Sequence, residues 1–156
     1  MPYKDVDEGH RISLTDDVLS HAKEVFDKGL ELEAILLAHE YLEQRLNAIS
    51  RKTVTASTPT IHRRFKQVIE VLHSERLLSD NDYGVLNEFN RLRNVNANQI
   101  LDFSLTLRGA KKGDMQKAMA LALEADSIVS QLFMDQSAVD KKTSRKHKKR
   151  KGSEGE

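Results

Sequence analysis

The segment Phe65–Asn98, FKQVIEVLHSERLLSDNDYGVLNEFNRLRNVNAN, decides the fold because two helical patterns follow each other within it. Ser79 and Asp82, where the second pattern starts, resemble a capping box with Asp in place of the usual Glu. They therefore predict where the second helix begins. Both patterns place apolar residues on one face, as a helix packed on a core requires. The first stripe contains Ile61, Phe65, Val68, Ile69 and Leu72, and the second contains Val85, Leu86, Phe89 and Leu92.

Helical patterns also precede this segment. Thr15, followed by two aspartates, predicts a capped helix start. Gly29 predicts a break, and a second helical run extends from about residue 30 to 50. Thr58-Pro59 combines a capping residue with proline at the first helical position, which predicts the start of the next helix.

A last helix follows the segment. Residues 100–109, ILDFSLTLRG, alternate apolar and polar residues, but a single strand has no partner here, so we interpret them as an extended link or an irregular continuation of the helix. Gly109 and Gly113 bracket a loop, and Asp114 caps a helix with an apolar inner face. That face contains Met115, Ala118, Met119, Ala122, Ala125, Ile128, Val129 and Leu132.

Composition limits the class of protein. A chain of 156 residues, 38% hydrophobic and 31% charged, is typical of one globular domain. It contains no apolar run near the 20 or so residues of a membrane span, no secretory signal and no cysteine, so we expect a cytoplasmic protein without disulfides. The prediction is an all-α antiparallel bundle of four to five helices over residues 15–137, after an N-terminal extension at 1–14.

Charge is distributed unevenly. Residues 1–139 contain 17 Lys and Arg against 21 Asp and Glu, whereas eight of the eleven residues 141–151 are basic. Such a block repels itself, so we expect a disordered basic tail at 138–156. The tail is either a solvated end or a contact for nucleic-acid phosphates. Its basic residues are Lys141, Lys142, Arg145, Lys146, Lys148, Lys149, Arg150 and Lys151.

Motifs of common enzymes are absent: the sequence has no phosphate-binding glycine loop, no HExxH pair and no GxSxG elbow. His21, His39, His62 and His73 never pair at the spacing that chelates a metal, so we expect no metal and no cofactor. Glu40 and Glu43 are one turn apart, a spacing that solvated or structural acids share with acid–base pairs.

The end of the segment, Arg91–Asn98, is unusually polar for a bundle helix. On a helix, Arg93, Asn94 and Asn98 converge on one patch while the opposite side is buried. The patch is either an Asn-rich helix end, since Asn is favoured near C-caps, or a polar cleft around Arg93.

The same residues resemble the signature of HEPN domains, the "higher eukaryotes and prokaryotes nucleotide-binding" superfamily. In that pattern, a helix and a short link of the LLS type precede a helix that ends in lRNxxaH. The segment HAKEVFDKGLELEAILLAHEYLEQRLNAI, residues 21–49, resembles the first two helices of the family, and the alanine-rich last helix also fits. The resemblance covers roughly residues 15–135.

This resemblance implies an all-α bundle, usually a homodimer, and in many members a metal-independent ribonuclease. Its motif is an arginine followed four to six residues later by a histidine. Arg93 matches the arginine and Asn94 the polar residue after it, whereas Asn98 lies where the histidine should be. The resemblance therefore assigns Arg93 to the phosphate, Asn94 to orientation and Asn98 to the acid–base position.

The change at Asn98 matters because cleavage of RNA without a metal needs a group that takes up and releases protons. Histidine does so near neutral pH, whereas an asparagine amide only donates and accepts hydrogen bonds. Loss of general acid–base catalysis typically costs about 10²- to 10⁴-fold in rate. We therefore expect a poor ribonuclease or none.

Three explanations of Asn98 remain open. The chain is a natural noncatalytic member that binds RNA, a nucleotide or a protein; or Asn98 is an inactivating replacement; or the base comes from His39, His62 or His73. The expected setting is RNA binding or cleavage in a defence, toxin–antitoxin or repressor-type module, with a second copy, RNA and a protein partner such as an antitoxin as candidate partners.

Overall fold

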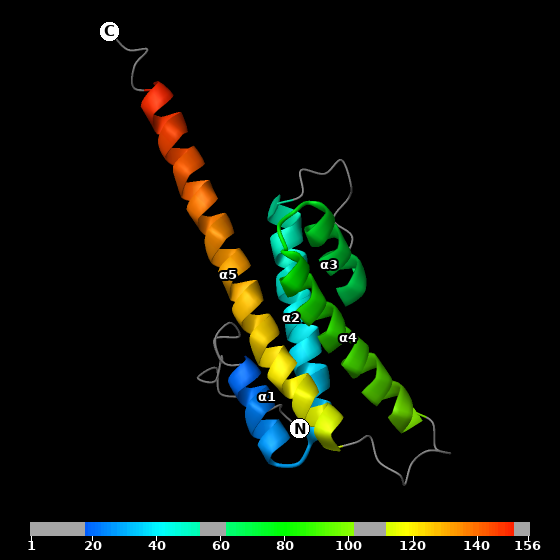
Figure 1. Ribbon diagram of the computed structural model, residues 1–156. Helices are drawn as coiled ribbons and strands as arrows, with labels where there is room; N and C mark the ends of the chain where they lie inside the picture. Colours follow the sequence, from blue (N-terminus) through cyan, green and yellow to red (C-terminus); the bar gives the residue numbers. More distant parts are fainter. Residues whose placement is uncertain (1–17, 54–61, 102–111, 152–156) are drawn as a thin grey trace, which may run out of the picture.

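The computed structural model describes residues 18–53, 62–101 and 112–151, which form a helical bundle (Figure 1). The helices are α1 (Val18–Asp27), α2 (Glu31–Thr53), α3 (Phe65–Ser74), α4 (Asp80–Leu101) and α5 (Lys112–Lys151). No strand occurs within these ranges, so the prediction of an all-α bundle is confirmed. The expected N-terminal extension, the cap at Thr15, Thr58-Pro59 and Gly109 lie outside the described residues.

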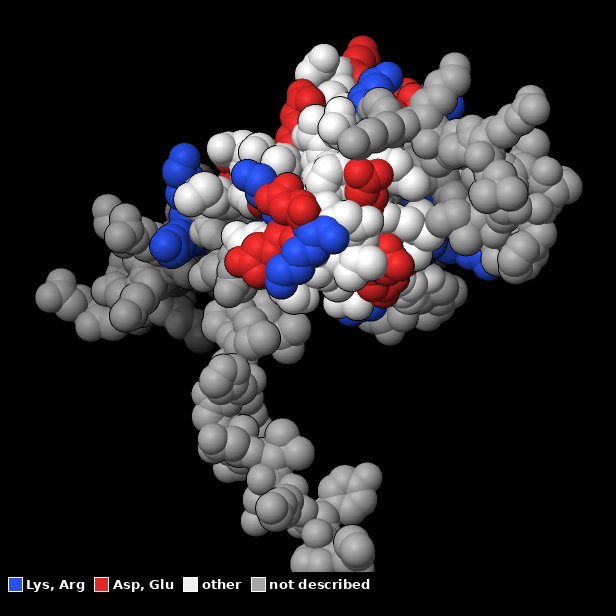
Figure 2. Space-filling view, turned by 90° about the horizontal axis from the view of Figure 1, so that it is seen from below, with Lys and Arg blue, Asp and Glu red and all other residues white. Residues whose placement is uncertain are grey.

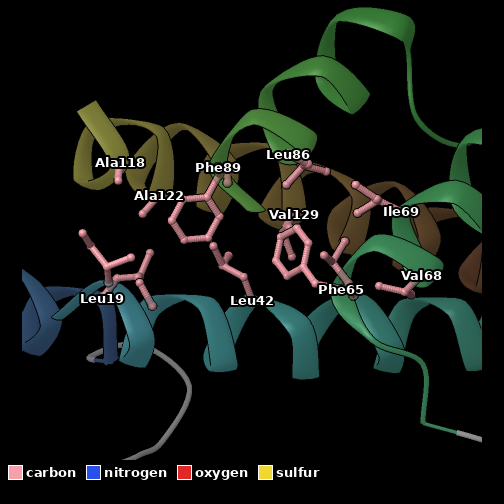
Figure 3. Close-up of a cluster of buried hydrophobic side chains, with 14 of the residues drawn as sticks. Leu19, Leu42, Phe65, Val68, Ile69, Leu86, Phe89, Ala118, Ala122 and Val129 are labelled. Atoms are coloured by element: carbon pink, nitrogen blue, oxygen red, sulfur yellow. The ribbon is translucent and has the colours of Figure 1, made fainter. Parts of the chain in front are cut away.

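One core joins all five helices. Side chains from every helix converge on it, and most of those labelled in Figure 3 are less than 2% exposed. Full burial of one such large apolar side chain stabilises the fold by roughly 1.5–3 kcal/mol. The apolar stripe predicted on α5 is buried at all its positions except Ile128, which is partly buried. The labelled residues are Leu19, Leu42, Phe65, Val68, Ile69, Leu86, Phe89, Ala118, Ala122 and Val129.

The helix directions depart from a simple up-and-down order. Arg45 of α2 contacts Asp126 of α5, and Lys52 of α2 contacts Phe133 of α5, so these two helices run in the same direction. Figure 1 shows that α3 also runs with α2, whereas α1 and α4 run the opposite way. His62, which precedes α3, lies beside Glu43 in the middle of α2 and not beside the C-terminal end of that helix.

The turn between α1 and α2 depends on Gly29. Its φ of +88° lies in a region that side chains with a Cβ rarely adopt. The Gly29 N–H donates to the Phe26 carbonyl and the Leu30 N–H to the Val25 carbonyl, which closes the end of α1. The break predicted at Gly29 is therefore confirmed.

The start of α3 differs from its prediction. Residues 62–64 are not helical and α3 begins at Phe65, so no continuous helix extends from Pro59. Side chains of α2 explain this position: Glu43 Oε2 accepts the Phe65 N–H at 2.8 Å, and Asn47 forms a pair of hydrogen bonds with the Arg63 backbone at 2.8 and 2.9 Å. A carboxylate at a helix N-terminus satisfies free N–H groups and the helix dipole.

The start of α4 agrees with its prediction. Ser79 Oγ accepts the Asp82 N–H at 3.1 Å, as an N-cap residue does. Asp80 and Asp82 lie in the first turn of the helix. The local spacing Ser79–Asp82 is therefore sufficient to locate this end.

The basic C-terminal segment differs from the expected disordered tail. The backbone of α5 stays helical to Lys151 and continues beyond the end of α2 as a single helix (Figure 1). Lysine, arginine and glutamine are good helix formers, and a helix already begun in the core is extended without a new nucleation step. In the described ranges, no helix combines the length and the apolar character that a membrane crossing requires.

Candidate functional site on α4

Arg93 and Asn94 form the centre of the predicted patch. Arg93 Nη1 donates to Asn94 Oδ1 at 2.9 Å on the exposed side of α4. The Nε–H of Arg93 is buried and has no hydrogen-bond partner among the described residues. An arginine has five N–H donors in a planar fork that matches phosphate oxygens, so the N–H groups at the tip of this guanidinium, rather than the buried Nε–H, are the donors suited to an anion.

Asn98, the third member of the patch, is four residues after Asn94. Its backbone belongs to α4, but its side chain lies outside the described residues. The structure therefore brings Arg93 and Asn94 together and leaves the third predicted contact a prediction.

A buried histidine lies on the inner side of the same part of α4. His39 of α2 is 6% exposed, and its Nε2 is 2.9 Å from Oδ1 of Asn90. Because an amide oxygen only accepts, the neutral ring carries its hydrogen on Nε2 in this bond. The ring stacks on Phe65 at 4.5 Å and lies 5.8 Å from Phe89.

The environment keeps His39 neutral. Burial is the main reason why the pKa of His39 falls below 6.5, and the positive charge of Arg93 lowers this pKa further. The hydrogen bond with Asn90, together with Glu43 and Glu40, acts in the opposite direction but does not cancel the burial. Because His39 is bonded to Asn90, one helical turn before Arg93, the imidazole lies against the part of α4 that carries Arg93.

The other described histidines are held by carboxylates or exposed. His62 Nε2 is 2.8 Å from Glu43 Oε1, and His73 Nε2 is 2.8 Å from Asp80 Oδ1. The His73 ring also stacks on Tyr83 at 4.5 Å, and His21 is exposed on α1. These contacts link neighbouring elements of the bundle.

The predicted pair Glu40 and Glu43 is divided between two environments. Glu43 supports the start of α3, whereas Glu40 is exposed and accepts a hydrogen bond from Gln44 at 3.0 Å. Among the described residues, no three His, Asp or Glu side chains are grouped so that they could hold a metal ion.

Charges at the end of the bundle from which α5 starts alternate in sign. Figure 2, seen from that end, shows acidic and basic side chains interspersed over the described surface. Attraction of a phosphate there depends on a local guanidinium more than on a broad positive field.

The predicted basic tail lies at the opposite end. Lys141 and Lys142 are exposed on α5. The other six basic residues continue the helical backbone, and their side chains lie outside the described residues.

Two buried asparagines were not assigned from the sequence. Asn90 follows Leu86 by four residues and thus lies on the apolar face of α4, and Asn47 lies between Leu46 and Ile49 on α2. A polar residue within an apolar stripe is the signal that identifies both, because a buried amide needs hydrogen-bond partners.

Comparison of the chain with protein-family models, with curated proteins and with solved structures finds no match. The assignment of the site therefore depends on the residues and on the geometry described above.

Proposed function

We propose that this chain is a HEPN-like domain that binds RNA through Arg93 and cleaves it weakly or not at all. The observation that carries the proposal is the guanidinium of Arg93, which Asn94 orients by accepting a hydrogen bond from Nη1. Two N–H groups of one arginine fit two oxygens of a phosphodiester. The resemblance of the segment 65–98 to the HEPN signature supports RNA as the source of that phosphate.

Weak cleavage follows from the proton-transfer groups. Asn98 replaces the histidine of the motif and cannot exchange a proton. His39, the histidine near Arg93, is buried against Phe65 and bonded to Asn90, so its geometry fits a structural role. Arg93 still stabilises charge on a phosphate, which by itself gives binding and little catalysis.

The proposal extends to the assembly. HEPN-like domains usually pair, and a second copy packed on the Arg93 side of α4 would enclose the phosphate between two arginines. In this proposal the dimer works in the cytoplasm, with a protein partner of the antitoxin type controlling access to RNA.

An RNA assay with chelator present tests binding and cleavage together. It uses end-labelled RNA and compares the full chain, Arg93→Ala, Asn98→His, and Asn98→His combined with Arg93→Ala. We expect the parent to bind RNA with little cleavage, Asn98→His to cut at least 10²-fold faster, and the double variant to lose both. Arg93→Ala alone should weaken binding about 10- to 100-fold, the range for a hydrogen bond to a charged group.

The outcomes separate the alternatives. Cleavage by Asn98→His that disappears with Arg93→Ala supports a ribonuclease site whose base is missing at position 98. RNA binding that depends on Arg93, without cleavage by any variant, leaves a noncatalytic RNA-binding module. Binding that is unchanged by Arg93→Ala contradicts the proposed site.

A further inference from the structure

An exposed aromatic ring between two cations lies on the opposite side of α2 from the start of α3. Phe133 of α5 is 41% exposed, although it is one of the largest apolar side chains in the protein. The guanidinium carbon of Arg45 lies 5.9 Å from its ring centroid, and Nζ of Lys52 lies 5.2 Å from it. Arg45 and Lys52 are seven residues apart, so they lie on one face of α2.

The two cations are not equivalent. Arg45 Nη1 is held by Asp126 at 3.0 Å, by Ser130 at 3.2 Å and by the Tyr41 hydroxyl at 3.2 Å, so its charge is offset. Lys52 is exposed and forms no ion pair with another described residue. A lysine ammonium on a flexible stem can leave the ring and contact a phosphate at little cost.

More positive charge follows along α5. Lys141 and Lys142 are exposed eight and nine residues after Phe133, about 12 Å farther along the helix. From Phe133 onward, α5 continues past the end of α2 (Figure 1). Two acids, Asp135 and Asp140, also belong to this part of α5, and Asp135 Oδ1 accepts a hydrogen bond from Gln131 at 2.9 Å.

We propose that Phe133, Lys52 and Lys141 form a contact surface for single-stranded RNA, separate from Arg93. A base stacks on the exposed ring of Phe133, Lys52 moves from the ring to a phosphate, and Lys141 contacts a phosphate farther along the strand. Single-stranded RNA fits because its unstacked bases offer faces to aromatic rings, whereas duplex bases are already stacked. The positive charges of Lys52 and Lys141 are complementary to the phosphates of the RNA backbone.

The choice of RNA as the ligand rests on the proposed function. The Phe133 surface and the Arg93 site consist of different residues, so variants can test them separately. The test measures binding of a fluorescent single-stranded 12-nucleotide RNA to the full chain by anisotropy. It compares the parent with Phe133→Ala, Phe133→Tyr, Lys52→Gln and Arg93→Ala. Leu123→Ala is the matched control, because Leu123 is 40% exposed on the same helix and lies ten residues, about 15 Å, before Phe133.

Stacking of one base predicts that Phe133→Ala weakens binding about 5- to 100-fold. Phe133→Tyr keeps a ring and should retain most of the affinity, and Leu123→Ala should leave it unchanged. Loss of one phosphate contact in Lys52→Gln should reduce the slope of log affinity against log salt by about 0.7. Unchanged thermal melting of Phe133→Ala would confirm that the variant folds.

Each remaining outcome decides between the two proposals. Equal affinity of the parent and Phe133→Ala, with weaker binding by Arg93→Ala, overturns this surface and leaves the α4 site. Weaker binding by Phe133→Ala alone supports this surface and contradicts the α4 site. Absence of RNA binding, equal affinity for duplex RNA, or conversion of a dimer to a monomer by Phe133→Ala overturns the stacking surface.

Discussion

His39 on α2 and Asn90 on α4 are joined by a hydrogen bond of 2.9 Å inside the core, although 51 residues separate them in the sequence. Asn90 lies three residues before Arg93, so the bond fixes the turn of α4 that carries the candidate phosphate contact. His39, Phe65 and Phe89 form a cluster of rings, and the imidazole is its polar member. The bond to Asn90 gives this imidazole a hydrogen-bond partner. The His39–Asn90 pair therefore both belongs to the core and supports the turn of α4 that carries Arg93.

Replacement of Asn90 by alanine should destabilise the fold. His39 would keep a buried N–H without its acceptor, which costs about 1–3 kcal/mol of unfolding free energy. Asn87→Ala is the matched control, because Asn87 is exposed one turn earlier on α4 and should change stability by less than about 0.5 kcal/mol. Urea unfolding of the three proteins measures the difference, and equal stability of both variants would contradict a buried hydrogen bond.

His39 should make the stability of the fold depend on pH. Burial lowers the pKa of His39 in the folded state, whereas the unfolded chain takes up this proton near pH 6.5. The unfolded state then binds more protons below that pH, so stability is highest above about pH 6.5 and falls as the pH decreases below it. The slope for one proton is at most about 1.4 kcal/mol per pH unit.

Unfolding of the parent, His39→Gln and His21→Gln between pH 5 and pH 8 measures this contribution. The parent should lose stability toward pH 5. His21→Gln should lose as much as the parent, because His21 is exposed on α1 and its replacement leaves His39 in place. His39→Gln should lose less over the same range. A steep loss that persists in His39→Gln would assign the pH dependence to another group.

Local patterns were sufficient for those parts of the fold that depend on neighbouring residues. Ser79 caps α4 as its spacing to Asp82 predicts, and Gly29 ends α1 with a positive φ. The start of α3 was predicted too early, because the carboxylate that accepts the Phe65 N–H is contributed by Glu43, 22 residues away. Helical propensity gives no information about such a distant partner.

In the candidate site, too, the sequence predicted what depends on neighbouring residues and not what depends on distant ones. Helix geometry predicted a patch of Arg93, Asn94 and Asn98, and the structure shows a hydrogen bond of 2.9 Å between the first two, while the convergence of all three stays a prediction. The pairing of His39 with Asn90 did not follow, because it depends on how α2 and α4 cross. The helical backbone up to Lys151 was missed because charge repulsion was weighted above helix propagation.

Gly84 should be replaceable with a gain in stability. It lies exposed inside α4, and a Cβ added at this position meets no atom within 4 Å. Alanine restricts the unfolded chain and suits a helix, so Gly84→Ala should raise the free energy of unfolding by roughly 0.5–1 kcal/mol. Gly29→Ala is the contrasting variant, since a φ of +88° strains any residue with a Cβ and should lower stability by about 1 kcal/mol or more. Thermal unfolding of both variants provides the measurement, and a loss in Gly84→Ala would indicate that a second chain approaches this helix.

Glu88 should contribute a salt- and pH-sensitive link between α4 and α5. Arg91 donates to its carboxylate from Nε and Nη2 at 2.7 and 2.8 Å, and Lys117 of α5 donates at 3.3 Å. The hydrogen bond from Arg91 is the main reason why the pKa of Glu88 falls to about 2. A lowered carboxyl pKa means that this stabilisation is present above about pH 4.5 and is lost as the pH falls toward 2.

Solvent limits the size of this effect, because the Glu88 side chain is 32% exposed. Glu88→Gln should therefore lower the free energy of unfolding at pH 7 by less than about 1 kcal/mol, and less in 1 M salt. Glu70→Gln is the matched control, since Glu70 contacts only Lys66 of its own helix among the ion pairs found, at 3.9 Å. Denaturant unfolding at pH 7 and pH 2.5 should show a cost of Glu88→Gln that shrinks toward low pH, because at pH 2.5 the unfolded parent has taken up the proton that the folded state, with a pKa of about 2, mostly has not. A cost that is equal at both pH values would show that the charge of Glu88 is not what links α4 to α5.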